Sequence, residues 1–262
     1  MSIALGLFAA FAAMFVKGLS GFGNTLVFTP LMNFQYDSKL ISPVDLLIGM
    51  PANAYMAWRE RKSISLKIAL PLVVLIYIGL IPGTIFLNIG DVRLLKVILG
   101  VAIMILGVEM ILREKQMQNG PKKKSNPLVL GIIGLGSGVL CGLFGVGAFL
   151  TAYLNRTTNN SSQFRANFCI VFLLENIARF CLYLYSGILT WESAKFAVML
   201  LPACILGLAV GILAAKKIPE KHAKKVVSIL LVLTGLSLTL QNIGVLFPNT
   251  ADMVGVSFVF TK

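Results

Sequence analysis

The sequence predicts an all-α polytopic membrane protein made of two inverted repeats, each a re-entrant, broken helical hairpin followed by three transmembrane helices. Three observations lead to this fold class. Several apolar runs approach the roughly 20 residues that a helix needs to cross a bilayer, and only 13% of the 262 residues are charged, about half the share of a soluble domain. A glycine-rich break in the first apolar run recurs in a later one. The basic residues gather in short loops between the runs.

Two apolar runs are each interrupted by three glycines in the same register. They are Gly18, Gly21 and Gly23 within residues 3–34, and Gly142, Gly145 and Gly147 within residues 127–154. Such clusters weaken a helix, because glycine loses more backbone freedom on folding than other residues do. A helix that restarts after the break presents unpaired N–H groups and a positive dipole end, which suits an anion. We interpret the breaks as anion-binding tips; the alternative is that the glycines only allow tight packing of a hairpin.

Three spans are predicted to complete each half. They are 41–58, 68–89 and 94–112 in the first half, and 167–190, 196–215 and 226–247 in the second. The glycine pairs Gly79/Gly83 and Gly207/Gly211 occupy equivalent places and favour close helix packing in lipid. The expected domain organisation is repeat 1 in 1–114, a basic cytoplasmic linker in 115–126, repeat 2 in 127–247 and a C-terminal tail in 248–262.

The distribution of charge favours one topology. If each broken run crossed the membrane once, the basic loops 113–124 and 216–225 would lie on opposite sides, against the positive-inside rule. If each run enters and returns as a hairpin, all four basic loops (59–67, 113–124, 156–165 and 216–225) lie in the cytoplasm. Because three spans are an odd number, the halves are then inverted, and both termini lie outside the cytoplasm. We expect a multi-pass protein of the cell (inner) membrane, with the two tips meeting near the midplane.

The residues around the two tips are the first candidate substrate-binding residues. They are Ser20, Gly21, Phe22, Gly23, Asn24 and Thr25 at the first tip, and Gly145, Val146, Gly147 and Ala148 at the second. The second tip has no polar side chain, so backbone N–H groups alone would bind an anion there. Lys17, just before the first tip, either adds positive charge to the site or extends its ammonium group toward the membrane surface.

Polar residues inside the span 167–190 form a second candidate group. Glu175 and Arg179 are four residues apart, so they share a helix face and can pair. Ionisable groups at that depth are costly and usually face a cavity or the protein interior. Either Arg179 contacts the anion while Glu175 orients it or carries a coupling proton, or the two form a neutralising structural pair. The neighbouring Asn176, and Asn53 near the equivalent place in the first half, are further candidate contacts.

Composition argues against several other functions. The net charge of +13 is spread over short loops, which is not typical of a nucleic-acid-binding domain. None of the four cysteines belongs to a CxxC pair and there is a single histidine, so we expect no metal site, cofactor or catalytic residue. A Walker motif is missing from the sequence, so ATP is not the expected energy source. We expect a transporter, with an anion channel as the alternative and a membrane-embedded enzyme as a weaker one. Its expected partners are a small anion and the lipid bilayer, and a homodimer is left open.

The two tips, the segment Leu80-Ile81-Pro82-Gly83 and the helix openings at Asp91 and Pro219-Glu220 resemble the TauE/SafE family, also called the sulfite exporter or TSUP family. The resemblance extends to residue 247. It implies a membrane permease of two related halves that moves sulfur-containing anions, mostly by export. Sulfite, a sulfonate or sulfoacetate is then the expected substrate, moved by alternating access with proton or ion coupling.

Overall fold

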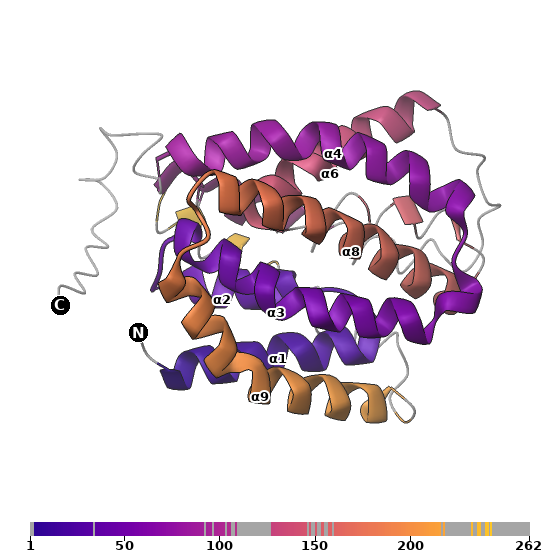
Figure 1. The fold of residues 1–262 in the computed structure, drawn as a ribbon, viewed down its shortest axis with the longest axis horizontal. Coiled ribbons are helices and arrows are strands. Elements are labelled where there is room, and N and C mark those ends of the chain that lie inside the picture. Colours follow the sequence, from indigo (N-terminus) through magenta and orange to yellow (C-terminus); the bar gives the residue numbers. More distant parts are fainter. Residues whose placement is uncertain are drawn as a thin grey trace.

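Helices make up all the regular structure in the described part of the chain, and no strand occurs there (Figure 1). This computed structural model describes residues 3–33, 35–91, 127–145 and 160–215, with single residues or short stretches between 93 and 108, between 147 and 158, and between 217 and 242. The helices are α1 (Ile3–Ser20), α2 (Asn24–Asn33), α3 (Ser38–Arg59), the short η1 (Arg61–Ser63), α4 (Leu66–Ile89), α6 (Pro127–Phe144), α8 (Ser161–Tyr185) and α9 (Trp191–Ala214). The linker 115–126, the tail 248–262 and most of the last predicted span lie outside the described residues.

Two outer helix pairs flank a central pair. Helix α1 packs along α9, and α4 packs along α6, while α3 and α8 lie between these pairs and contact each other (Figure 1). Helix α2 packs against both α1 and α3. Helices from the two predicted repeats therefore alternate in space, and each outer pair joins one helix of the first half to one of the second.

Glycines bring the backbones of each outer pair into direct contact. A Cβ atom at Gly18 would lie 2.5 Å from the carbonyl oxygen of Leu208, and one at Gly142 would lie 2.6 Å from that of Leu80. Gly211 and Gly83 occupy the facing positions on α9 and α4. Gly83 and Gly211 belong to the small-residue pairs that the sequence indicated, and the missing side chains allow the close approach. Gly18 and Gly142 were assigned to the breaks, but they lie inside α1 and α6 and serve this packing instead.

The helix ends gather into two groups at opposite ends of the molecule. At the basic end, residues 59–67 meet residues 160–165: Ser162 donates a hydrogen bond to Glu60, and Arg165 lies 3.7 Å from the same carboxylate. At the opposite end, residues 37–39, 88–91 and 186–191 gather, where Lys39 donates to the carbonyl of Asn88 at 2.7 Å. Helix α1 begins and α2 finishes at the opposite end, so the first broken run enters and leaves on the same side (Figure 1).

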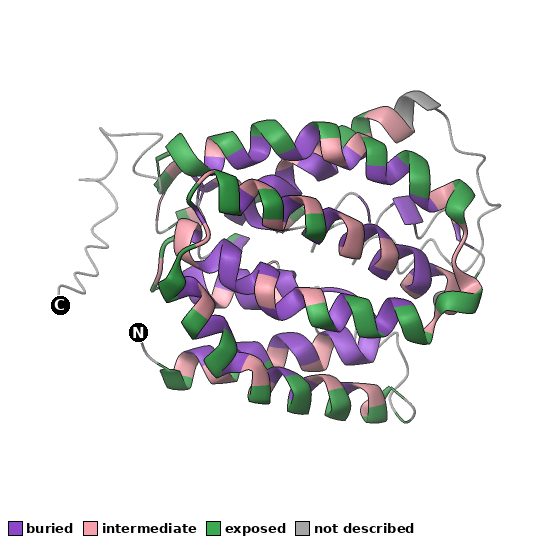
Figure 2. Ribbon diagram, viewed as in Figure 1, coloured by how far each residue is buried: buried purple, intermediate pink, exposed green. Residues whose placement is uncertain are grey.

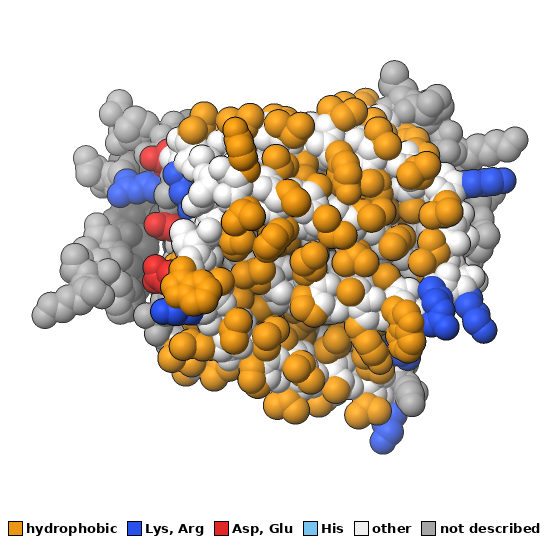
Figure 3. All heavy atoms as spheres, viewed as in Figure 1, with side chains coloured by type: hydrophobic (Ala, Val, Ile, Leu, Met, Phe, Trp, Pro, Cys, Tyr) orange, Lys and Arg blue, Asp and Glu red, His pale blue; other side chains and the backbone are white. Residues whose placement is uncertain are grey.

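The sides of the molecule are apolar over the length of the helices. Four helices in the described residues are long and apolar enough to cross a membrane, namely Ile3–Ser20, Leu66–Ile89, Ser162–Tyr185 and Trp191–Ala214. Their outward faces expose large apolar side chains, for example Ile78 on α4 and Ile205 on α9 (Figures 2 and 3). This surface fits the hydrocarbon of a bilayer, and the chain is a polytopic helical membrane protein.

The first hairpin has unequal arms, which the sequence did not indicate. Helix α1 has 18 residues, about 27 Å at 1.5 Å per residue, whereas α2 has 10, about 15 Å. The first tip reaches the first turns of α8, where Cys169 donates to the carbonyl of Gly21. The second tip reaches Arg179, 10 residues further along α8 and therefore about 15 Å away. The tips pass each other instead of meeting near the midplane, because each first arm is longer than half a span.

Candidate functional site

The first tip is built by two glycines that adopt a left-handed backbone. Gly21 has φ = 86° and Gly23 has φ = 89°, values that strain any residue with a Cβ atom. Gly21 also packs directly on the side chain of Arg165. The chain thus stops as a helix at Ser20 and restarts at Asn24, which places the first turn of α2 inside the molecule.

Ser20 and Phe22, two of the predicted substrate contacts at this tip, make contacts elsewhere in the protein. The hydroxyl of Ser20 lies 2.8 Å from the carbonyl oxygen of Val16, within its own helix. The ring of Phe22 packs against Phe164 and Phe168, with centroid distances of 5.4 and 5.7 Å. The contacts of both residues are therefore with the backbone around the break and with the aromatic side chains of α8.

Lys17, Asn24 and Asn53 come together as a buried cluster. The Lys17 ammonium donates to Asn24 Oδ1 at 3.0 Å and to Asn53 Oδ1 at 2.5 Å. These residues belong to α1, α2 and α3, and the Lys17 side chain has no solvent-exposed surface. Of the two interpretations offered by the sequence, the structure therefore has the ammonium pointing into the protein and not toward the membrane surface.

Asp45 joins this cluster, although the sequence analysis did not select it. Thr25 Oγ1 donates to Asp45 Oδ2 at 2.7 Å, and Asn24 Nδ2 lies 3.4 Å from Asp45 Oδ1. Asp45 is 1% exposed. The signal was available, because Asp45 is an acidic residue inside the apolar run 41–58, which is the same criterion that selected Glu175.

Arg179 is the centre of a second buried cluster. Its Nε lies 3.2 Å from Glu175 Oε1, its Nη1 donates to the carbonyl of Cys141 at 3.0 Å, and its Nη2 donates to Asn176 Oδ1 at 3.1 Å. The guanidinium also lies 5.7 Å from the centre of the Tyr183 ring, a distance that allows a cation–π contact. Arg179 is only 1% exposed, so these contacts replace water around its charge.

The second tip lies against this cluster. Gly145 has φ = 71°, and a Cβ atom there would collide with the guanidinium of Arg179. A Cβ atom at Gly147 would collide with the ring of Phe172. Val146 and Ala148 lie outside the described residues, so the predicted backbone contacts of this tip stay a prediction.

The two clusters follow one pattern. In each, a buried cation donates to an asparagine Oδ1 and lies beside a hairpin break: Lys17 with Asn53 at the first, and Arg179 with Asn176 at the second. Asp45 interacts electrostatically with both Lys17 and Arg179, so the two clusters are close enough to affect each other's charges. The two clusters together bury two cations, two carboxylates and the amide groups of Asn24, Asn53 and Asn176.

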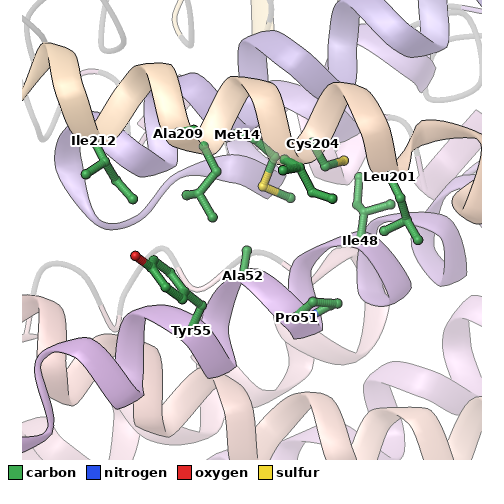
Figure 4. Close-up of a pocket in the computed structure, with 11 residues that line it drawn as sticks. Met14, Ile48, Pro51, Ala52, Tyr55, Leu201, Cys204, Ala209 and Ile212 are labelled. Atoms are coloured by element: carbon green, nitrogen blue, oxygen red, sulfur yellow. The ribbon is translucent and has the colours of Figure 1, made fainter.

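A separate groove lies beside α3 (Figure 4). It has a volume of about 330 Å³ and runs between α3 and α9, with Met14 of α1 beneath it. The Tyr55 hydroxyl and the Cys204 thiol are its polar groups, and the other lining side chains are aliphatic or methionine. This lining suits hydrocarbon and gives an anion no cationic partner.

The described residues contain no group of three or more His, Cys, Asp or Glu side chains that could hold a metal ion. The four cysteines are free, and all but Cys181 are buried. The charged side chains buried in the described part of the chain are the two cations and two carboxylates of the clusters.

Long apolar helices around a buried, charged interior define an integral, polytopic membrane protein. Residues 6–238 match the family described as Sulfite exporter TauE/SafE, and the chain belongs to this family. Neither the curated proteins nor the solved structures include a significant match to the chain. The resemblance inferred from the glycine motifs is thereby confirmed.

Proposed function

We propose that this protein is a permease that exports a small sulfur-containing anion, such as sulfite, a sulfonate or sulfoacetate, by alternating access. The observation that carries this proposal is the presence of two buried cations, Lys17 and Arg179, each beside a glycine-rich helix break. Burying such charges is costly, and in transporters they usually mark the path of a substrate. Membership of the TauE/SafE family supports the class of anion.

The substrate site lies between the two clusters. Lys17, Asn24 and Asn53 bind the anion from one side, and Arg179 with Asn176 from the other. The positive end of the α2 dipole adds to the field at Asn24 and Thr25. Glu175 holds Nε of Arg179 and leaves its two Nη groups directed at neutral acceptors, which an anion can displace.

Alternating access follows from two inverted repeats. Equivalent contacts support that arrangement: Gly18 meets Leu208 as Gly142 meets Leu80, and α1 runs parallel to α9 as α6 runs parallel to α4. In such folds one half rocks against the other around a site near the middle of the membrane. Transport is coupled to protons or another ion, and Glu175 is one candidate coupling residue.

The basic end faces the cytoplasm. Among the described residues it carries six basic side chains (Arg59, Arg61, Lys62, Lys67, Arg165 and Lys217) and one acidic one (Glu60). The opposite end carries three of each sign, namely Lys39, Arg93, Lys195, Asp37, Asp91 and Glu192, and Figure 3 shows this difference between the ends. The positive-inside rule then orients the protein and places its N-terminus outside the cytoplasm.

Cysteine labelling tests this orientation. In a variant without the native cysteines, Lys62→Cys and Glu192→Cys each introduce an exposed thiol at one end. We expect a membrane-impermeant maleimide to label Glu192→Cys in intact spheroplasts and Lys62→Cys only in inside-out vesicles. The reverse pattern contradicts the proposed orientation.

Transport by purified protein in liposomes tests the function itself. We expect saturable uptake of radiolabelled sulfite or sulfoacetate by the wild type, and a loss of roughly tenfold to a hundredfold in Lys17→Met. The reason is that a hydrogen bond to a charged group contributes about 1.5–3 kcal/mol.

Lys62→Met is the matched control, because Lys62 is exposed at the basic end. It should transport like the wild type. Conductance that does not saturate and shows no counter-transport indicates a channel instead, and movement of neither anion refutes the proposed substrate class.

A further inference from the structure

Asp45 already fills an anion position. Its carboxylate accepts from Thr25 Oγ1 at 2.7 Å and lies 3.4 Å from Asn24 Nδ2. Asn24 and Thr25 are the first two residues of α2, so the carboxylate sits at the positive end of that helix. Asn24 also accepts from the Lys17 ammonium. The donors that an incoming anion needs at the first tip are therefore engaged by a side chain of the protein.

The charges of the described interior are balanced without a substrate. Lys17 and Arg179 carry two positive charges, and Asp45 and Glu175 carry two negative ones, all at most 1% exposed. An anion that enters this interior alone adds an uncompensated negative charge in a medium of low dielectric constant, which is strongly unfavourable. A proton bound by one of the two carboxylates restores the balance.

The carboxylates of Glu175 and Asp45 differ in their interaction partners. Glu175 contacts Arg179 Nε at 3.2 Å, so protonating it weakens the ion pair that orients the guanidinium. Asp45 instead accepts hydrogen bonds from a hydroxyl and an amide. Protonating Asp45 therefore weakens no ion pair as short as that between Glu175 and Arg179. Asp45 is thus the carboxylate that can become neutral while both cations keep their positions.

We propose that Asp45 binds the proton that travels with the substrate, and that its carboxylate and the anion alternate as the negative charge at the start of α2. This inference rests on the proposed function and adds a coupling residue to it. The proton comes from the aqueous phase on the side where the anion enters, is held on an Asp45 carboxyl oxygen while the anion occupies the site, and leaves on the other side with it.

Groups from several helices set the field at Asp45. The charged and titratable residues that interact with it are Lys17 from α1, Glu175, Arg179 and Tyr183 from α8, and Cys204 from α9. The two cations favour the charged carboxylate and Glu175 opposes it. An arriving anion adds to the effect of Glu175, so anion binding and proton binding at Asp45 reinforce each other, as linkage requires.

The test compares wild type, Asp45→Asn and Asp37→Asn in liposomes that contain a pH-sensitive dye. Asparagine keeps the shape of a protonated aspartate and cannot release a proton. We expect wild type to carry protons inward together with radiolabelled sulfite or sulfoacetate.

In Asp45→Asn, uptake driven by a pH gradient should fall by about tenfold or more, on the scale of typical coupling between two ligands. Exchange of labelled for unlabelled anion should fall much less than uptake driven by the pH gradient, because exchange needs no net proton movement.

Asp37→Asn is the matched control, since Asp37 is exposed just before α3 and its side chain makes no capping hydrogen bond. It should behave as wild type in both assays. Proton uptake that is unchanged in Asp45→Asn overturns the coupling role and leaves the permease intact. Loss of exchange in a folded Asp45→Asn protein overturns it too, because the anion then needs the charged carboxylate. If wild type moves neither anion, the proposed function fails and the coupling role with it.

Thr25→Val provides a second test if Asp45→Asn does not fold. This change removes the hydroxyl that stabilises the charged carboxylate. Asp45 then binds its proton more readily, so the pH at which uptake is half-maximal should move upward. An unchanged pH profile in folded Thr25→Val contradicts the proposal.

Discussion

Replacing Arg179 by methionine is expected to abolish transport and to destabilise the protein. The variant leaves the Glu175 carboxylate buried without its cation, which typically costs about 3–5 kcal/mol. It also removes the two Nη groups that we assign to the substrate. Transport is measured in liposomes, and stability by the thermal unfolding of protein purified in detergent.

The double variant Arg179→Met/Glu175→Gln separates the structural from the functional role. Because both charges are gone, we expect most of the lost stability to return, as happens when a buried ion pair is replaced as a unit. Transport should stay absent, since the cation is still missing. If the double variant transports like the wild type, the pair is only structural, which is the alternative that the sequence left open.

Replacing Gly142 by leucine is expected to prevent correct packing of α6 against α4. A Cβ atom there would lie 2.6 Å from the Leu80 carbonyl oxygen and 2.8 Å from the Thr84 nitrogen. These are backbone atoms, so no side chain can move aside. Overpacking of this kind costs about 1–3 kcal/mol or more. We expect aggregation or a strongly lowered unfolding temperature, visible by size-exclusion chromatography of a fluorescent fusion.

Gly131→Leu is the control in the same helix. Among the described residues, no atom outside the neighbouring backbone of α6 lies within 4 Å of a Cβ placed at Gly131, so this variant should give a monodisperse peak and nearly the unfolding temperature of the wild type. Equal behaviour of the two variants would mean that the close contact between α6 and α4 does not hold the fold together.

Much of the site was predictable, because polar residues are conspicuous in apolar sequence. Glu175 and Arg179 were selected on that ground and Lys17 for its place just before the first tip, and the structure buries all three. The pairing of Glu175 with Arg179 followed from a helix period alone. Asn53 and Asn176 were selected by their places in the two halves, and each accepts a hydrogen bond from a buried cation.

Other contacts depended on how distant segments pack. Asp45 meets Thr25 across 20 residues, and nothing in the local sequence says that α2 returns along α3. Ser20 and Phe22 belong to the glycine motif, yet one bonds its own helix and the other joins the aromatic side chains of α8. The depth of each tip was also missed, because it depends on where α1 packs along α9 and where α6 packs along α4.

The sequence by itself determined the helical membrane fold, the two helix breaks and the presence of Glu175 and Arg179 inside a span. These follow from hydropathy, from the backbone freedom of glycine and from the cost of placing charge in lipid, and all three act locally. Only the tertiary structure decided that Asp45 faces Lys17 and that the tips pass each other. Those facts depend on contacts between residues far apart in the chain, for which a single sequence carries no local signal.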